Sequence, residues 1–420
     1  MGKNIGFVST RFAGTDGVSL ESAKWAQLLW DHQHISYWFA GVLDRHASVS
    51  MEVPEAFFDH EENRWINDRI FGKQVRSPYV TGRIHALRDY LKIKLYEFIA
   101  KFNIDLLIIQ NALSLPMHVP LALAITELLA ETAIPTVAHH HDFYWERTRY
   151  AVNAVQDYIQ MAFPPKLPNI QHVVINSIAQ EELALRTGIS SMVIPNVLDF
   201  EHEPEIDWDF IKDFRSEIGI GEDDKIILQP TRVVRRKGIE LAIDLVHALR
   251  NPKYKLVVTH PAGDEGYEYA KFLQEYAKDL EVDLKIIDTF VGDRRGVGPD
   301  GKKRYSLWDV YPNADFVTYP SLYEGFGNAL LEAIYFRKPI LVNRYDVFIR
   351  DIEPLGFKFV VMNGYITDRV VEEVRELLED PGKCSETVDY NYELALRHFS
   401  YSVLRKRLGY LISNFFGFEI

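Results

Sequence analysis

Cysteine is almost absent from this sequence, since Cys384 is the only one among 420 residues. A single thiol cannot form an internal disulfide, so nothing supports an oxidising compartment and a cytoplasmic location is expected. Long apolar runs are lacking as well, because no stretch approaches the roughly 20 residues that cross a bilayer. Residues 1–17 contain a short apolar strand and not the longer core of a signal peptide. These absences predict a soluble chain.

Positive charge is also in short supply. Lysine and arginine number 47 against 60 aspartate and glutamate residues, a net charge of −13, and an acidic chain is a poor general binder of polyanions. Nucleic acid is therefore not expected as a partner. Residues 199–224 alone hold 11 acidic residues against Lys212 and Arg215. We interpret this segment as a solvated acidic linker between two domains, with one short helix around Trp208–Ile218.

Three widespread enzyme motifs are missing. None is complete: residues 296–303, GVGPDGKK, have the G-x-G-x-x-G spacing without a strand directly before and a helix directly after it. Lys303 stands where a P-loop has Ser or Thr, and no G-x-S-x-G elbow occurs. Their absence argues against a dinucleotide dehydrogenase, an α/β-hydrolase and a P-loop nucleotidase.

Short β-rich runs alternate with helical patterns along the whole chain. Several runs, such as residues 106–109 and 173–175, are continuously apolar, as expected of parallel strands covered on both faces. Six runs lie on each side of the acidic segment, so the expected fold is α/β with two doubly wound, Rossmann-like halves. The predicted strands are Ile5–Ser9, Ile35–Phe39, Asp105–Ile109, Thr136–His139, His172–Asn176, Met192–Ile194, Ile226–Gln229, Lys255–Thr259, Leu284–Ile287, Asp315–Tyr319, Pro339–Val342 and Phe357–Met362.

Two further segments have helical apolar spacing. Residues 83–102 combine an apolar stripe with basic residues elsewhere, which fits a helix that covers the strand that follows it. A helix lying on an anionic membrane surface is the alternative and is not favoured. Residues 398–416 follow the last predicted strand and could pack on either half.

The most informative motif is PSLYEGFGNALLE at residues 320–332, which follows a predicted strand and leads into a helix. Its two glycines allow backbone amides to approach a ligand, and a helix N-terminus near Asn328 favours an anion such as a diphosphate. Glu324 and Glu332 flank this point with seven residues between them. Carboxylates there repel phosphate but suit the hydroxyl groups of a sugar.

A second motif, PTRVVRRKG at residues 230–238, also lies between a predicted strand and a helix. Arg232 and Lys237 stand at the carboxyl end of a parallel strand, where doubly wound folds bind ligands. Two fixed cations can neutralise a leaving diphosphate without a metal. Arg235 and Arg236 are assigned to the surface, because adjacent side chains diverge.

Together the two motifs, in this order, resemble those of the retaining glycosyltransferases of family 4, which have the two-domain GT-B fold. Further landmarks are similar and correctly ordered, and they cover nearly the whole chain: Asp16-Gly17-Val18, Asn176-Ser177 and Ile194-Pro195-Asn196. The resemblance implies an acceptor-side domain at residues 1–199 and a donor-binding domain at residues 200–401, facing each other across a cleft. It also implies that a final helix, residues 402–420, crosses back to the first domain.

The resemblance assigns a role to each matched residue. Arg232 and Lys237 hold the diphosphate of a nucleotide sugar, Glu324 binds hexose hydroxyls and Glu332 binds the ribose. The amides of Gly325, Phe326, Gly327 and Asn328 contact the donor, and the loop at Gly17 faces the donor or the acceptor. A plain turn before a helix is the alternative for the Gly17 loop.

The run His139-His140-His141-Asp142 closes a predicted strand. His141 is the best match to the histidine with which the family orients the donor sugar. Metal binding is one alternative to this role, since His139 and His141 share a face of the strand, but the other ligands of a metal site are missing. A structural histidine is the other alternative. His140 points the other way and is expected in the core.

The resemblance implies a retaining hexosyltransferase that needs no metal or other cofactor. Its donor is a nucleotide diphosphate sugar, with UDP-glucose favoured over GDP-mannose, and its acceptor is a hydroxyl of a small soluble molecule, such as a glycerate-type solute, or of a glycan. The alternatives are a nucleotide-sugar epimerase on the same fold and a nucleotide-sugar-binding protein without turnover. Residues 44–82 and 292–303 follow no pattern that identifies the acceptor or the base, and the oligomeric state stays open.

Overall fold

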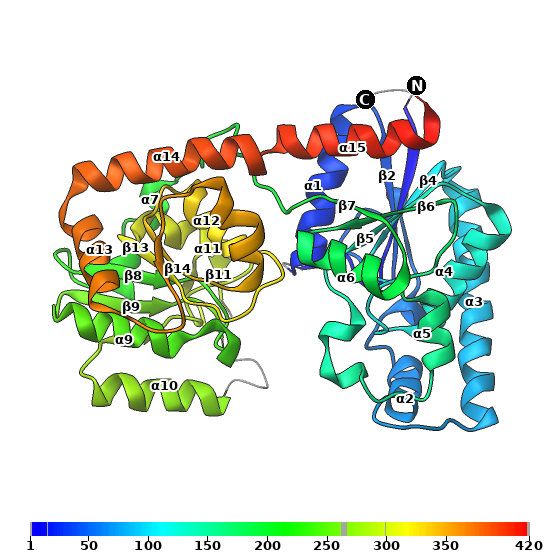
Figure 1. Ribbon diagram of the computed structural model, residues 1–420, viewed down its shortest axis with the longest axis horizontal. Helices are drawn as coiled ribbons and strands as arrows, with labels where there is room; N and C mark the ends of the chain where they lie inside the picture. The colour runs from blue at the N-terminus through cyan, green and yellow to red at the C-terminus, as the bar shows by residue number, and fades with distance from the viewer. Residues whose placement is uncertain (1, 15, 262–266, 299, 418–420) are drawn as a thin grey trace. The chain divides into compact units, whose positions relative to one another are not determined.

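The chain forms two compact units in the computed structural model, which describes residues 2–14, 16–261, 267–298 and 300–417. Unit 1 comprises Met1–Asn196 and Ser402–Ile420, and unit 2 comprises Val197–Tyr401. Each unit is a parallel β-sheet between layers of helices (Figure 1). The doubly wound α/β fold expected from the sequence is thereby confirmed.

Unit 1 contains a seven-stranded sheet in the order β3-β2-β1-β4-β5-β6-β7, and all neighbouring strands are parallel. Its strands are β1 (Asn4–Val8), β2 (Ile35–Ala40), β3 (Ser50–Glu52), β4 (Leu106–Gln110), β5 (Thr136–His140), β6 (Ile170–Val174) and β7 (Ser191–Val193). Each β4 and β5 residue is buried, as a central parallel strand requires. Sequence reasoning missed only β3 here, because its three residues, SME, contain no apolar run.

Helices cover both faces of this sheet. Figure 1 shows α3, α4 and α5 on one side and α1 and α6 on the other. The helices of unit 1 are α1 (Gly17–Asp31), α2 (Glu61–Ile70), α3 (Pro78–Phe102), α4 (Val119–Thr132), α5 (Gln156–Ala162), α6 (Ser177–Thr187) and α15 (Tyr401–Phe416). Gln171 of β6 donates to the carbonyl of Leu411 at 3.4 Å, so α15 packs on unit 1 although it ends the chain.

Helix α3 resolves the two interpretations of residues 83–102. Its apolar stripe is buried in the core beneath it, from Val80 to Phe102. Four of its five lysine and arginine residues are paired with acids of the same unit: Arg83 with Glu62, Arg88 and Lys92 with Glu127, and Lys94 with Glu97. The helix is therefore a sheet-covering one. Among the described residues, no helix is long and apolar enough to cross a membrane.

Unit 2 contains a six-stranded parallel sheet in the order β10-β9-β8-β13-β14-β15. Its strands are β8 (Lys225–Gln229), β9 (Tyr254–Val258), β10 (Leu284–Ile286), β13 (Phe316–Tyr319), β14 (Ile340–Asn343) and β15 (Val360–Met362). Its helices are α7 (Trp208–Ile211), α8 (Phe214–Glu217), α9 (Ile239–Leu249), α10 (Tyr267–Asp279), α11 (Leu307–Val310), α12 (Asn328–Tyr335), α13 (Asp368–Glu379) and α14 (Pro381–Phe399). One core joins α9, α10 and α13 to the sheet, and α12 packs against α14.

The acidic segment 199–224 differs from its expected form. It contains two four-residue helices, α7 and α8, in place of one helix around Trp208–Ile218. It is also not merely solvated, because Asp213 pairs with Lys303 at 2.5 Å and Asp207 with Arg295 at 3.3 Å. Both cations belong to the insertion after Val291, which forms a small antiparallel hairpin of β11 (Gly296–Val297) and β12 (Lys303–Arg304). Residues 199–224 thus hold the insertion at residues 292–303 in place within unit 2 through these ion pairs.

Candidate active site

Neighbouring strands bring the two loop motifs of unit 2 together. β8 and β13 are adjacent and parallel, so the loops that follow them leave the same edge of the sheet. The amide of Leu322 donates to the carbonyl of Arg236 at 2.8 Å. Gly238 has φ of +60°, and a Cβ on it would lie 2.5 Å from the carbonyl oxygen of Pro320. Only glycine allows the two loops to touch at this point.

Glu324 is the centre of the resulting charge cluster. Its carboxylate accepts a short hydrogen bond from the ammonium of Lys237 and another from Arg236 at 3.1 Å. Lys237 and Glu324 are each only 8% exposed. Burial acts to raise the pKa of Glu324, but the ammonium of Lys237 and the guanidinium of Arg236 outweigh it and hold that pKa below its ordinary value. The site is therefore charged and held in place before any ligand binds.

Arg236 lies at the surface as expected, with 39% of its side chain exposed, but it also takes part in the charge cluster. Besides pairing with Glu324, its guanidinium donates to the carbonyl of Tyr323 at 3.1 Å. The neighbouring side chains do diverge, since the Arg235 guanidinium lies 5.3 Å from the ring centroid of Tyr269. A short 3₁₀ helix at Arg235–Lys237 turns positions 236 and 237 toward the glycine loop, and the strand-based expectation did not include it.

Arg232 supplies an exposed cation beside this cluster. Its charge lowers the pKa of both Lys237 and His260, in each case as a smaller effect than burial. His260 follows β9 and its Nδ1 lies 2.7 Å from the hydroxyl of Thr259. Sequence reasoning missed His260, although a histidine at the carboxyl end of a predicted parallel strand was a usable signal.

The glycine loop leads directly into α12. Gly327 has φ of +121°, and a Cβ there would lie 2.7 Å from the hydroxyl oxygen of Tyr345. That hydroxyl donates to the carbonyl of Phe326 at 2.8 Å, while the ring of Phe326 is buried against Phe399. The loop is thereby fixed with the N-terminus of α12, at Asn328, beside it. This end of a helix attracts anions.

Glu332 lies within α12, partly buried, where it accepts a hydrogen bond from the buried hydroxyl of Tyr311 at 2.9 Å. Its carboxylate is thus held by a side chain from the segment after α11. Eight of the ten predicted site residues belong to unit 2: Arg232, Lys237, Glu324, Gly325, Phe326, Gly327, Asn328 and Glu332.

The other two predicted residues, Gly17 and His141, belong to unit 1. Gly17 is the first residue of α1, and the carboxylate of Asp16 caps this helix by accepting from the amides of Val18 and Ser19. The loop before it includes Thr15, which lies outside the described residues. The first-turn amides of Val18 and Ser19 are thus satisfied by the protein itself.

The histidine run has two distinct faces. His140 is buried and its Nε2 lies 2.9 Å from His172 Nδ1, so its assignment to the core is confirmed. His139 stacks on Trp25, with ring centroids 4.4 Å apart, and lies next to His141 on the same face. No group of three or more metal-ligating side chains lies close enough to hold a metal ion in the part of the chain that the structure describes.

His141 is held by residues at the end of β4. Its Nε2 lies 3.1 Å from Oε1 of Gln110, and its amide donates to the side chain of Asn111 at 3.0 Å. Burial lowers the pKa of His141 to about 4, so the imidazole is neutral at pH 7. Sequence reasoning missed Gln110 and Asn111, because contacts between neighbouring strands leave no local signal.

The fold and the loop motifs define the class of protein, and comparisons with known proteins agree. Residues 210–394 match the family model of glycosyl transferases group 1. Mannosylglucosylglycerate synthase of Thermotoga maritima is 35% identical, covering 94% of this chain and 96% of that protein. The enzyme of the same name from Petrotoga mobilis is 37% identical, covering 86% of each. The structure of Anabaena HepE in complex with UDP-glucose has a TM-score of 0.65, at 14% identity and coverage of 98% of this chain and 100% of that one.

The protein is thus a glycosyltransferase with the GT-B fold. Within that class, the chain belongs to the family-4 type of group 1 glycosyltransferases, as its loop motifs indicated.

Proposed function

We propose that this enzyme transfers a mannosyl group from a nucleotide diphosphate sugar, GDP-mannose in the first place, to a hydroxyl of glucosylglycerate. The main support for placing the donor here is a charge cluster beside the N-terminus of α12, formed by Arg232, Arg236, Lys237 and Glu324. Two cations that face one carboxylate, with a third cation beside them, leave positive charge for a diphosphate. A cluster without net charge would attract a diphosphate less strongly.

The relatives support the choice of sugar and acceptor. Two proteins that this chain matches over most of its length are named for making mannosylglucosylglycerate. Their name favours mannose as the transferred sugar, whereas the sequence expectation favoured UDP-glucose without a residue that decides the donor. UDP-glucose is kept as the second donor, because it is the ligand of a solved structure with this fold.

The proposed reaction retains the anomeric configuration. The bond between the anomeric carbon and the phosphate oxygen of the donor breaks, and a bond to the acceptor oxygen forms on the same face of the sugar. The acceptor proton goes to the departing diphosphate, which leaves as the nucleoside diphosphate. Arg232 and Lys237 stabilise the charge that develops on it, as a metal does in other phosphate-releasing enzymes. The neutral imidazole of His141 orients the sugar and carries no proton away.

Donor binding is expected to raise the melting temperature of the protein. At a concentration of about 100 Kd, a ligand that binds only the folded state adds about 2.7 kcal/mol of stability, which corresponds to a rise of several degrees. GDP-mannose is expected to give a larger rise than UDP-glucose, and EDTA is expected to leave both unchanged. Differential scanning fluorimetry measures these shifts.

Two exposed arginines of unit 2 make the test specific. Arg232→Ala is expected to remove most of the shift, whereas Arg250→Ala, which removes an exposed cation at the end of α9, keeps it. If no nucleotide sugar shifts the melting temperature, or if both variants respond like the wild type, the donor site is wrongly placed.

A further inference from the structure

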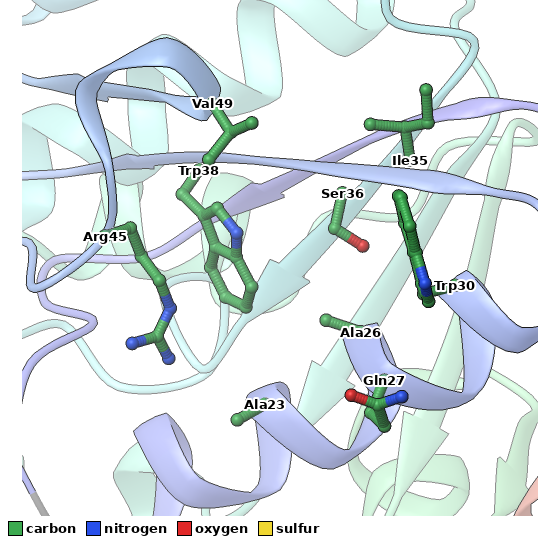
Figure 2. Close-up of a pocket in the computed structure, with 9 residues that line it drawn as sticks. All are labelled: Ala23, Ala26, Gln27, Trp30, Ile35, Ser36, Trp38, Arg45 and Val49. Atoms are coloured by element: carbon green, nitrogen blue, oxygen red, sulfur yellow. The ribbon is translucent and has the colours of Figure 1, made fainter.

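Unit 1 has a groove that the transfer reaction does not use. It lies between α1 and β2, has a volume of about 430 Å³, and is lined mainly by Ala23, Ala26, Gln27, Trp30, Ser36 and Trp38, with Arg45 at one end. Figure 2 shows α1 along one side and β2 along the other, with the indoles of Trp30 and Trp38 toward opposite ends. This volume is within the usual range for small-molecule sites.

The sequence explains why the groove is open. Ala23, Ala26, Gln27 and Trp30 recur at helical spacing and form one stripe of α1, and the two alanines are too small to fill the space in front of β2. The neighbouring edge strand β3 has only three residues. Between β2 and β3 the chain forms only a three-residue 3₁₀ helix, Ala47–Val49, whose Val49 lines the groove without filling it.

Trp30 provides an exposed aromatic platform. Its side chain is 63% exposed, which is unusual for so large an apolar group. Trp38 offers a ligand only the edge of its ring. The ring of Phe7 stacks on it, with the centroids 4.6 Å apart, and the Arg45 guanidinium lies 4.8 Å from its centroid. Figure 2 shows the indole nitrogen of Trp38 on the side turned toward Ser36. The groove thus combines one open aromatic face with an indole edge that can donate a hydrogen bond.

Gln27 and Ser36 are uncharged polar side chains of the groove, and the side-chain amide of Gln27 donates to the carboxylate of Asp31 at 3.2 Å. The guanidinium of Arg45 is paired with the carboxylate of Asp44, so it adds no unbalanced charge. The hydroxyl of Ser36 is buried and has no hydrogen-bond partner among the described residues, and Figure 2 shows it directed into the space between the two indoles. A buried hydroxyl without a partner costs free energy, which a ligand or an ordered water offsets when the groove opens enough to expose this oxygen.

We propose that this groove is a second saccharide site, which binds a neutral pyranoside. The C–H groups on one face of a pyranose carry partial positive charge and suit the negative face of an indole, here Trp30. Its ring hydroxyls suit the neutral donors and acceptors at Gln27, Ser36 and Trp38. A nucleotide or sugar phosphate lacks an unpaired cation here, and a purely apolar ligand leaves the Ser36 hydroxyl unsatisfied. The site belongs to unit 1 alone and does not depend on the proposed transfer reaction.

Binding of methyl α-D-glucopyranoside and methyl α-D-mannopyranoside, followed by saturation-transfer NMR and by tryptophan emission, tests the proposal. The wild type is expected to bind at least one of them with a millimolar Kd. Trp30→Ala is expected to weaken binding by about tenfold or more, with an unchanged melting temperature because the side chain is exposed. Ser36→Ala is expected to weaken it less.

Two control variants separate this groove from other sites. Trp208→Ala removes a tryptophan of unit 2 that is also 63% exposed, and His141→Ala alters the candidate active site; both are expected to leave glycoside binding intact. Equal binding of cyclohexanol, which has the ring without its hydroxyl pattern, overturns the proposal. Unchanged glycoside binding by Trp30→Ala, or loss of binding in His141→Ala, also overturns it. The proposal fails as well if the wild type binds no glycoside and instead self-associates in a way that Trp30→Ala abolishes.

Discussion

Lys237→Met is expected to lower kcat for glycosyl transfer by about a thousandfold, since one preorganised group that stabilises transition-state charge contributes 10²–10³ or more. The ammonium of Lys237 is buried, is held by Glu324 and lies next to Arg232. Methionine keeps most of the apolar stem and removes only the charge that meets the departing diphosphate. A coupled assay for the released nucleoside diphosphate measures the loss.

Two further variants distinguish catalysis from folding. Lys237→Met leaves Glu324 buried with Arg236 as its remaining cation, so some loss of stability is expected. The double variant Lys237→Met/Glu324→Gln removes the unbalanced carboxylate and is expected to regain stability without regaining activity. Lys225→Met is the matched control, because this lysine also pairs with a carboxylate, that of Asp315 at 2.9 Å. It lies at the start of β8, the strand that precedes the loop of Lys237. Nearly normal activity in the double variant would contradict the assigned role.

Unit 1 is expected to lose stability steeply as the pH falls from about 6.5 toward 4. Burial lowers the pKa of His118, His141 and His172 to about 4 each, and it also lowers those of His139 and His140 well below their ordinary value. The unfolded chain takes up these protons near pH 6.5, whereas the folded unit does so only near pH 4. The unfolded state therefore binds more protons throughout this window, and each histidine costs about 2 kcal/mol of stability at pH 5 relative to pH 8.

Urea unfolding at pH 7.5 and pH 5.0 measures this effect through tryptophan emission. Five of the seven tryptophans lie in unit 1, so the signal reports mainly on that unit. His172→Gln is expected to reduce the pH dependence by one proton. His202→Gln is the control, because that histidine is exposed and the carboxylate of Asp199 raises its pKa. A free energy of unfolding that is equal at the two pH values would contradict this prediction.

The sheets could be predicted from the sequence because their strands carry a strong local signal. A parallel strand covered on both faces must be apolar throughout, and β4, LLIIQ, was recognisable for that reason. The strands that were missed lack such a run. β3 has three residues and β11 and β12 have two each, and their polar residues are satisfied by long-range pairs such as that of Lys303 with Asp213.

The candidate site was predictable only where its residues belong to a compact motif. Lys237 and Glu324 were found because glycines and a strand end surround them. The pairing of Arg236 with Glu324 was missed, because the two residues are 88 positions apart and only the packing of two loops brings them together. Gln110 was missed for the same reason, since it reaches His141 across neighbouring strands. Pairings of this kind depend on the tertiary fold and leave no mark in a local stretch of sequence.

The most direct test of the account is NMR analysis of the product formed from GDP-mannose and glucosylglycerate by the wild-type enzyme in the presence of EDTA. The account predicts one new glycosidic bond from mannose to the acceptor, with the α configuration of the donor retained and GDP released in equal amount. A β-linked product, or donor that is hydrolysed or epimerised without transfer, would contradict it.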